Sequence, residues 1–178
     1  MKKTKLKSIF ALIICGLLYL TFAVGSGSDA TTSNTSTSTD SQTKTSEIAK
    51  YKLNEDIYIK KSTGEYRIKF TNVYETSDRN EFSDIVANKV VIIEYEYENI
   101  SLPDDLLVDD WSFKLYDKEN NSLETYPVDT KYSGSVGTGR KATASVAYAL
   151  NSDSNYIELD YYDNMFNSKA DCRVILEW

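Results

Sequence analysis

The stretch from Lys89 to Asn99, KVVIIEYEYEN, constrains the fold of this chain more than any other. Successive side chains of a β-strand point to opposite faces, so alternate residues share a face. One face of this stretch carries Val91, Ile93, Tyr95 and Tyr97, and the other carries Val90, Ile92, Glu94, Glu96 and Glu98. The pattern is typical of a strand with one packed face and one charged face. We therefore predict that it is the central strand of a β domain.

Other short apolar-alternating segments, separated by turn-forming residues, recur along the chain. The expected strands are 57–59, 66–74, 111–116, 123–126, 142–149, 157–161 and 174–178. In the third of these, Trp111, Phe113 and Leu115 are expected to point inward. Residues 75–88 are predicted to form a polar loop with a short helical turn at 81–87. About seven or eight strands without a sustained helical period predict an all-β antiparallel sandwich or barrel.

The N-terminal 48 residues predict export and a tether. Residues 1–25 join a basic start, KKTKLK, to an apolar run and small residues, which indicates either a cleaved signal peptide or a retained membrane anchor helix. Residues 26–48 are rich in Ser and Thr, with twelve among the sixteen residues 31–46, and predict a disordered linker. The expected folded domain is 49–178. Lipidation of Cys15 is disfavoured because Ile14 precedes it and the sequence after it stays apolar.

The composition argues against several classes of function. Four of the 20 basic residues lie in the first 25 positions, so the rest of the chain has 16 basic side chains against 27 acidic ones, a formal charge of −11. A nucleic-acid binder would need a basic surface. The chain contains no histidine, which removes the usual general base of serine and cysteine nucleophiles. No cofactor is expected, and contact with a membrane is expected only through the N-terminal segment.

Two groups of acidic residues could still carry chemistry. Glu94, Glu96 and Glu98 would stand about 6.8 Å apart along one strand face, within the roughly 6.5 to 9.5 Å used by inverting glycosidases. An ordinary charged face, with Arg67 and Lys69 as cross-strand partners, explains them better. A loop with Asp104, Asp105, Asp109 and Asp110 is a weak candidate for calcium, although its spacing fits no EF-hand.

Three further features have ordinary structural interpretations. The glycine-rich segment 134–141 resembles a phosphate-binding loop but lacks its lysine and a following helix, so an inter-strand loop is expected. Cys172 is expected to be a small buried residue of a late strand, rather than a reactive thiol. Several tyrosines are expected on outward strand faces, where some could form a contact surface for a protein or glycan: Tyr58, Tyr74, Tyr116, Tyr156 and Tyr162.

The order of several short motifs resembles a known family. These are Tyr97–Ser101 at the end of a strand, the turn at 116–118, the glycine-bearing loop, and the segments 144–148, 157–162 and 174–176. Together they resemble the immunoglobulin-like extracellular domain of Gram-positive lipoproteins, a domain of unknown function that is also similar to a secreted mycobacterial immunoprotective antigen. The resemblance covers about 130 residues, 49–178. It implies an immunoglobulin-like sandwich and supplies no catalytic residues. In this chain Cys15 departs from the usual lipid-attachment motif, and the antibody-type cysteine pair is missing.

These observations favour a non-enzymatic, extracytoplasmic interaction module. It would be secreted or anchored at a bacterial cell surface by the N-terminal segment and would bind an envelope protein or glycan. The alternative is an enzyme of the glycan-hydrolase type, or a calcium-dependent domain, that uses the acidic groups.

Overall fold

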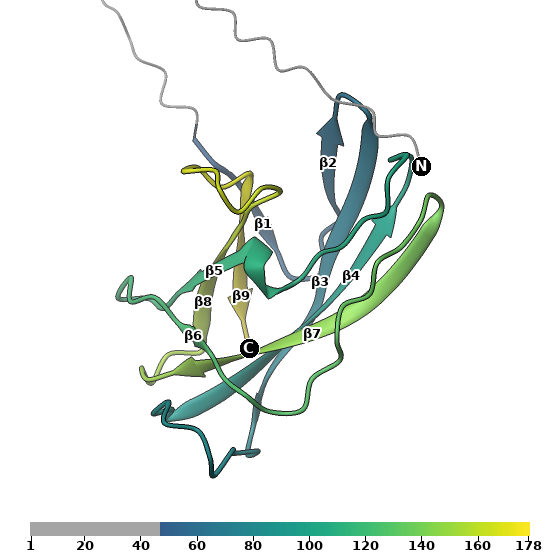
Figure 1. Cartoon of the computed structure of the whole chain (residues 1–178). Helices are drawn as coiled ribbons and strands as arrows, with labels where there is room; N and C mark the ends of the chain where they lie inside the picture. Colours follow the sequence, from purple (N-terminus) through teal and green to yellow (C-terminus); the bar gives the residue numbers. More distant parts are fainter. Residues whose placement is uncertain (1–46) are drawn as a thin grey trace, which may run out of the picture. The chain divides into compact units, whose positions relative to one another are not determined.

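The computed structural model describes residues 47–178, so the predictions for 1–25 and for most of the linker at 26–48 lie outside the described residues. Two sheets contain the strands (Figure 1). The first has the order β1-β9-β8-β5, with β1 at Ala49–Lys52, β9 at Cys172–Glu177, β8 at Tyr156–Tyr161 and β5 at Phe113–Tyr116. The second has the order β2-β3-β4-β7-β6, with β2 at Ile57–Lys61, β3 at Gly64–Thr76, β4 at Lys89–Asn99, β7 at Arg140–Leu150 and β6 at Glu124–Thr125.

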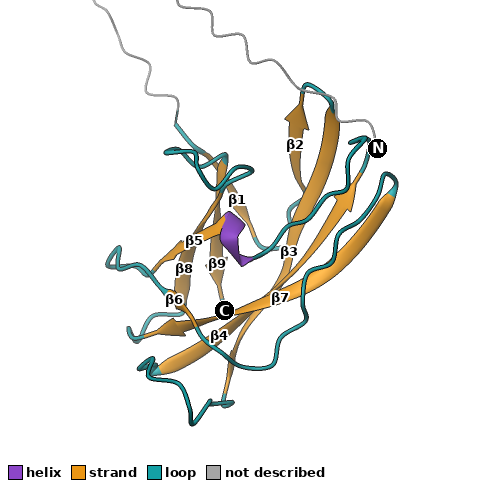
Figure 2. Ribbon diagram, viewed as in Figure 1, coloured by secondary structure: helices purple, strands orange, loops and turns teal. Residues whose placement is uncertain are grey.

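The all-β sandwich predicted from the sequence is confirmed, and KVVIIEYEYEN is β4, the middle strand of the five-stranded sheet (Figure 2). The expectation of a wholly antiparallel arrangement was wrong, because β1 pairs with β9 in parallel. Every other strand pair within residues 47–178 is antiparallel. The immunoglobulin-like assignment stays a prediction. In the same range, no helix is long and apolar enough to cross a membrane.

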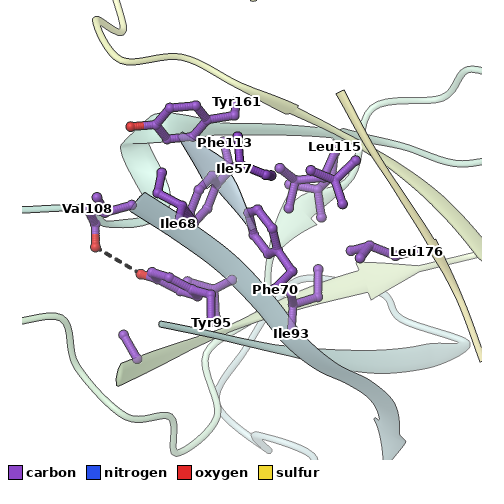
Figure 3. Close-up of a cluster of buried hydrophobic side chains, with 14 of the residues drawn as sticks. Ile57, Ile68, Phe70, Ile93, Tyr95, Val108, Phe113, Leu115, Tyr161 and Leu176 are labelled. Carbon is purple, nitrogen blue, oxygen red and sulfur yellow. Dashed lines mark hydrogen bonds between the residues drawn. The ribbon is translucent and has the colours of Figure 1, made fainter. Parts of the chain in front are cut away.

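The main core lies between the two sheets and is rich in aromatic rings (Figure 3). Phe113 of β5 stands at its centre, with ring centroids 5.6 Å from Phe70, 5.2 Å from Tyr95 and 6.1 Å from Tyr161. The hydroxyl of Tyr95 is satisfied inside the core because it donates to the Val108 carbonyl at 3.0 Å. Edge-to-face ring pairs of this kind stabilise the folded state beyond what the burial of apolar surface alone contributes.

The outer face of β4 is less polar in the structure than its sequence predicts. Val90 and Ile92, which share that face with the three glutamates, are buried in a second cluster with Ala147, Ala149 and Tyr126. Ile85, Ala87 and Val128 pack against this cluster. The loop between β3 and β4 and the segment after β6 therefore cover one half of the outer face. The other half carries the glutamates, which are half-buried.

Three local predictions were wrong. Trp111 lies in the 3₁₀ turn η1, Asp110–Ser112, and is exposed, because the Asp109 carboxylate accepts from the Trp111 amide and delays the start of the strand until Phe113. The return strand at 123–126 shrinks to β6, which crosses to the other sheet and pairs with β7. Residues 81–87 contain a turn and no helix.

Gly64, at the start of β3, occupies a position that no other residue fits. Its φ is +154°, and a Cβ there would lie 2.5 Å from the Ser101 carbonyl oxygen. We expect Gly64→Ala to lower the free energy of unfolding by about 2–3 kcal/mol. Gly134→Ala is the control, because a Cβ at Gly134 meets nothing within 4 Å. Urea denaturation measures both, and equal stabilities would contradict the assignment of a close approach at Gly64.

Candidate interaction surface

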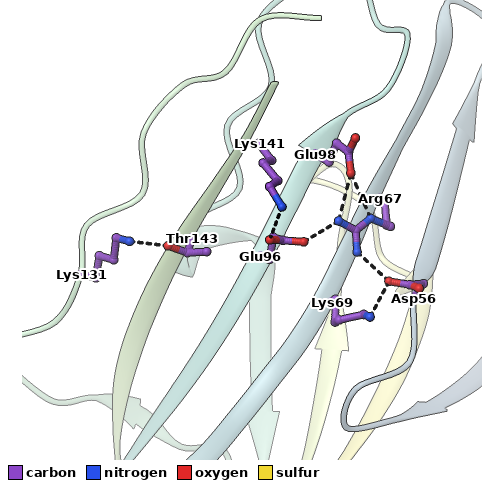
Figure 4. Close-up of polar contacts among 8 residues, drawn as sticks. All are labelled: Asp56, Arg67, Lys69, Glu96, Glu98, Lys131, Lys141 and Thr143. Atoms are coloured by element: carbon purple, nitrogen blue, oxygen red, sulfur yellow. Dashed lines mark hydrogen bonds and ion pairs between the residues drawn. The ribbon is translucent and has the colours of Figure 1, made fainter. Parts of the chain in front are cut away.

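The acidic face of β4 is an ion-pair network (Figure 4). Arg67 of β3 donates to Glu96 at 2.5 Å, to Glu98 at 3.0 Å and to Asp56 at 2.7 Å. Lys141 adds a contact to Glu96 at 3.2 Å, and Lys69 pairs with Asp56 at 3.0 Å. The prediction that Arg67 pairs with glutamates of the neighbouring strand is therefore confirmed. The same prediction for Lys69 was wrong, because Lys69 pairs with Asp56.

This network suits a structural role better than glycoside hydrolysis. A glycosidase needs one carboxyl group that stays protonated and can act as an acid. The hydrogen bond from Arg67 instead lowers the pKa of Glu96, and so does the contact with Lys141. Both ionised oxygens of Glu96 are held by cations. The geometry thus gives Glu96 no proton to donate at neutral pH.

The four aspartates proposed as a weak calcium candidate do not form a common site. Asp109 caps η1, and burial raises the pKa of its carboxyl group. Asp105 contacts the Ser135 hydroxyl at 3.4 Å, while Asp104 and Asp105 are both exposed. Among residues 47–178, no three acidic or cysteine side chains lie close enough together to hold a metal ion.

Residues 134–139 of the glycine-rich segment form an inter-strand loop, as predicted, and 140–141 begin β7. Val136 bridges to Leu106, and Gly139, with φ +71°, precedes the first residue of β7. A strand rather than a helix follows the loop, so it presents no helix N-terminus to a phosphate.

Cys172 is buried at the start of β9, as predicted, and burial raises the pKa of its thiol to about 12. In a Cys15→Ser variant, we expect Cys172 to react with Ellman's reagent at pH 8 on the order of 10³-fold more slowly in the native protein than in guanidinium chloride. Equal rates in the two conditions would show that the thiol is accessible.

The predicted outward tyrosines divide into exposed and buried members. Tyr58 and Tyr74 are exposed, and Tyr116 and Tyr156 are half-buried. The expectation for Tyr162 was wrong, because this residue is 6% exposed and lies under the Lys114 ammonium group, 4.5 Å from the ring centroid. These tyrosines do not form one continuous contact surface by themselves.

A group of exposed apolar side chains gathers instead at one end of the sandwich, where the segment carrying η1 lies beside the loop between β8 and β9 (Figure 1). The Tyr162 amide donates to the Ser112 carbonyl at 2.8 Å and joins the two segments. We call the following four residues the end patch, with their exposed fractions: Leu107 51%, Trp111 68%, Met165 44% and Phe166 87%. Exposed apolar side chains scattered singly are ordinary, but a group of them marks an interaction site.

Two hollows open within the end patch. One, of about 440 Å³, is lined by Trp111 and Met165, and the other, of about 190 Å³, by Leu107. Lys61 and Asp163 line both hollows. The end patch is therefore a shaped surface with a polar group at its centre.

The polar centre is a chain of hydrogen bonds that joins Lys61, Asp163, Tyr66 and Tyr161. The Lys61 ammonium group lies 2.8 Å from the Asp163 carboxylate, which also accepts from the Tyr66 hydroxyl. The Tyr66 and Tyr161 hydroxyls are 2.7 Å apart. Burial raises the pKa of both phenols, so they remain protonated. The network fixes the ends of β2, β3 and β8 and gives the end patch a rigid base.

A larger hollow, of about 660 Å³, lies at the opposite end but is a weaker candidate. It is lined mainly by polar turn residues, among them Asp117, Asn121 and Asn151. Asp117 accepts from the Glu119 and Asn121 amides at 2.9 Å, and Asn121 also donates its side chain to it. These polar groups are used to hold the turn together.

The sequence pattern does not reveal the end patch, and it places Trp111, one of its members, in the core. A signal is nevertheless present in the loop DNMFNSK at 163–169, where Met165 and Phe166 interrupt charged and amide side chains and no strand periodicity predicts their burial. The loop PDDLLVDD at 103–110 gives no such signal, because Leu106 and Val108 are buried and only Leu107 between them is exposed.

Comparisons with solved structures support the fold. MPT63, a secreted protein from Mycobacterium tuberculosis, is similar to this chain with a TM-score of 0.57 and 10% identity, over 75% of this chain and 99% of MPT63. The yjhA protein from Bacillus subtilis is similar with a TM-score of 0.50 and 18% identity, over 71% of this chain and 98% of that one. No protein-family model and no curated protein sequence matches the chain. At these identities the likeness establishes a shared sandwich architecture.

Proposed function

We propose that residues 49–178 form a non-enzymatic interaction module that works outside the cytoplasm, secreted or anchored at a bacterial cell surface, and binds an envelope component through the end patch. The observation that carries this proposal is that exposed Leu107, Trp111 and Met165 line two hollows, with exposed Phe166 next to Met165 in the same loop. Exposed aromatic and methionine side chains in a shaped surface are the usual anchors of protein interfaces.

The chemistry of the end patch favours binding over catalysis. Asp163 is engaged by Lys61 and Tyr66 at once, and the two buried phenols hold their protons. A general base or nucleophile would need a group with a free lone pair and a pKa near neutrality. The groups at the base of the hollows are instead arranged to keep the surface rigid.

Two observations support a location outside the cytoplasm. The basic and apolar start of the chain has the composition of an export signal or membrane anchor. MPT63, which shares the architecture, is a secreted protein. The Ser/Thr-rich stretch at 26–48 would then serve as a tether between a membrane and the sandwich.

Cross-linking and affinity capture from intact cells tests this function. We expect the wild-type protein to enrich one partner, and the double variant Trp111→Ala, Phe166→Ser to lose it. The matched control is Phe82→Ser, Val86→Ser, which removes two exposed apolar side chains from the loop between β3 and β4 at the other end. This control should capture the partner as the wild type does.

The competing enzyme hypothesis makes the opposite prediction. Turnover of cell-wall sugar by the wild-type protein, abolished by Glu96→Gln without a change in melting temperature and accompanied by no enriched partner, would overturn the proposed function.

A further inference from the structure

The side chains that surround the end patch are strongly acidic. Carboxylates that line its two hollows are Asp104, Asp105, Asp109 and Asp163. A third hollow, of about 460 Å³, shares Asp109 and adds Asp110 beside the aromatic ring of Tyr132. Lys61 is the basic residue among those that line these three hollows. Its charge is matched by Asp163 at 2.8 Å.

These acidic groups differ from the carboxylates on the sheet faces. Glu96 and Asp160 are held by arginine at 2.5 and 2.6 Å. By contrast, the contacts described for Asp105 and Asp109 are with a serine hydroxyl at 3.4 Å and a backbone amide at 3.2 Å. Neither contact neutralises a charge. The residues that line the three hollows therefore carry a net negative charge, which acts where a partner would approach.

From this charge and apolar pattern we propose that the partner presents a cationic segment in which lysine or arginine side chains stand next to apolar ones. The inference rests on the proposed function and narrows it. Trp111, 68% exposed beside Asp109 and Asp110, offers both a ring face for a cation and a carboxylate within the same few residues. The apolar side chains of the partner segment would then pack against Leu107, Met165 and Phe166. A neutral glycan would gain little from this excess of negative charge, and an acidic partner would be repelled.

A peptide-binding measurement tests the inference with purified full-length protein. The probe is a fluorescently labelled peptide with several lysines and leucines in a glycine-serine background, and a second probe has glutamate at each lysine position. We expect the lysine peptide to bind and the glutamate peptide not to bind. Raising the salt concentration should weaken binding, because exposed charges are screened over a Debye length of about 8 Å at physiological ionic strength.

A charge-neutralised variant locates the binding. Asp104→Asn, Asp105→Asn, Asp109→Asn removes three charges from the end patch, and asparagine at 109 can still cap η1. We expect the dissociation constant for the lysine peptide to rise about fivefold, because each neutralised carboxylate removes one weak, exposed ion pair with the peptide. The Trp111→Ala variant should weaken binding by a similar factor.

A matched control separates the end patch from the general acidity of the chain. The control is a second triple variant, Asp78→Asn, Glu81→Gln, Asp84→Asn. It removes the same number of negative charges, but from the exposed loop between β3 and β4 at the other end. This control should bind the lysine peptide as the wild type does.

The contrary outcomes are distinct. Equal weakening by both triple variants would show non-specific attraction and overturn the inference. Binding of neutral wall oligosaccharides that depends on Trp111 and is insensitive to salt would also overturn it, while leaving the end patch as the functional surface. Cellular capture that does not depend on Trp111 would overturn the proposed function itself.

Discussion

Replacing Phe113 by alanine should lower the free energy of unfolding by about 4 kcal/mol, a value typical of removing a large aromatic side chain from a packed core. The Phe113 ring is the contact through which β5 reaches Phe70 and Tyr95 of the opposite sheet and Tyr161 of its own. Its removal leaves a cavity between the sheets that rigid aromatic neighbours cannot fill. Because a domain of this size is stable by only about 5–15 kcal/mol, the melting temperature should fall by roughly 15 °C.

Trp111→Ala is the matched control for Phe113→Ala, two residues away and larger in the side chain it removes. Trp111 is 68% exposed, so its loss should change the free energy of unfolding by less than about 1 kcal/mol. Differential scanning calorimetry measures both variants. If Trp111→Ala lowered the free energy of unfolding more than Phe113→Ala does, Trp111 would point into the core, as the sequence pattern predicts, and the structure would be contradicted.

Arg67→Met should destabilise the domain by about 3 kcal/mol, because it leaves three carboxylates close together without their common cation. Arg67 is 13% exposed and contacts Asp56, Glu96 and Glu98. Lys69→Met is the control, since Lys69 has one partner described, Asp56, at 3.0 Å, and its loss should cost less than about 1 kcal/mol. Equal effects in urea denaturation would contradict the central position of Arg67.

The pH dependence of the Arg67→Met variant provides a second readout. The hydrogen bond from Arg67 lowers the folded-state pKa of Glu96 and of Asp56. The unfolded chain therefore binds more protons in acid, so this part of the stability is present above about pH 4.5, the ordinary range of these groups, and is lost as the pH falls through the lowered values. The difference in stability between wild type and Arg67→Met should accordingly shrink between about pH 5 and pH 3.

The period-two pattern of β4 was sufficient to predict its place in the sheet and the identity of its packed face. The pattern succeeds because Val91, Ile93, Tyr95 and Tyr97 all face the same core. It could not predict that Val90 and Ile92 are buried as well. Part of their cover comes from Tyr126 and Val128, more than 30 residues away, and no local periodicity reports a contact of that range.

The failures at Trp111, Tyr162 and β1 have separate physical causes. A capped 3₁₀ turn interrupts the alternation that seemed to bury Trp111. Tyr162 follows the end of β8, where its amide donates to the Ser112 carbonyl and the Lys114 side chain lies over its ring. The strand β1, AKYK, is short, polar and mostly exposed, so only its parallel pairing with β9 defines it as a strand.

The candidate surface was harder to predict than the fold. From the sequence, rows of glutamate and aspartate were the candidate sites, but the structure pairs Glu96 and Glu98 with Arg67 and spreads the aspartates along one loop. The apolar members of the end patch come from loops about 50 residues apart, and only the packing of β8 against β5 brings those loops together.

The most direct test of the end patch as the functional surface is site-specific photo-cross-linking in intact cells. A photoreactive phenylalanine analogue at position 111 should form an adduct with one partner. The same analogue at position 82, another exposed aromatic site at the opposite end, should form none with that partner. An adduct that forms equally well from position 82, or from position 82 alone, would contradict the assignment of the end patch as the functional surface.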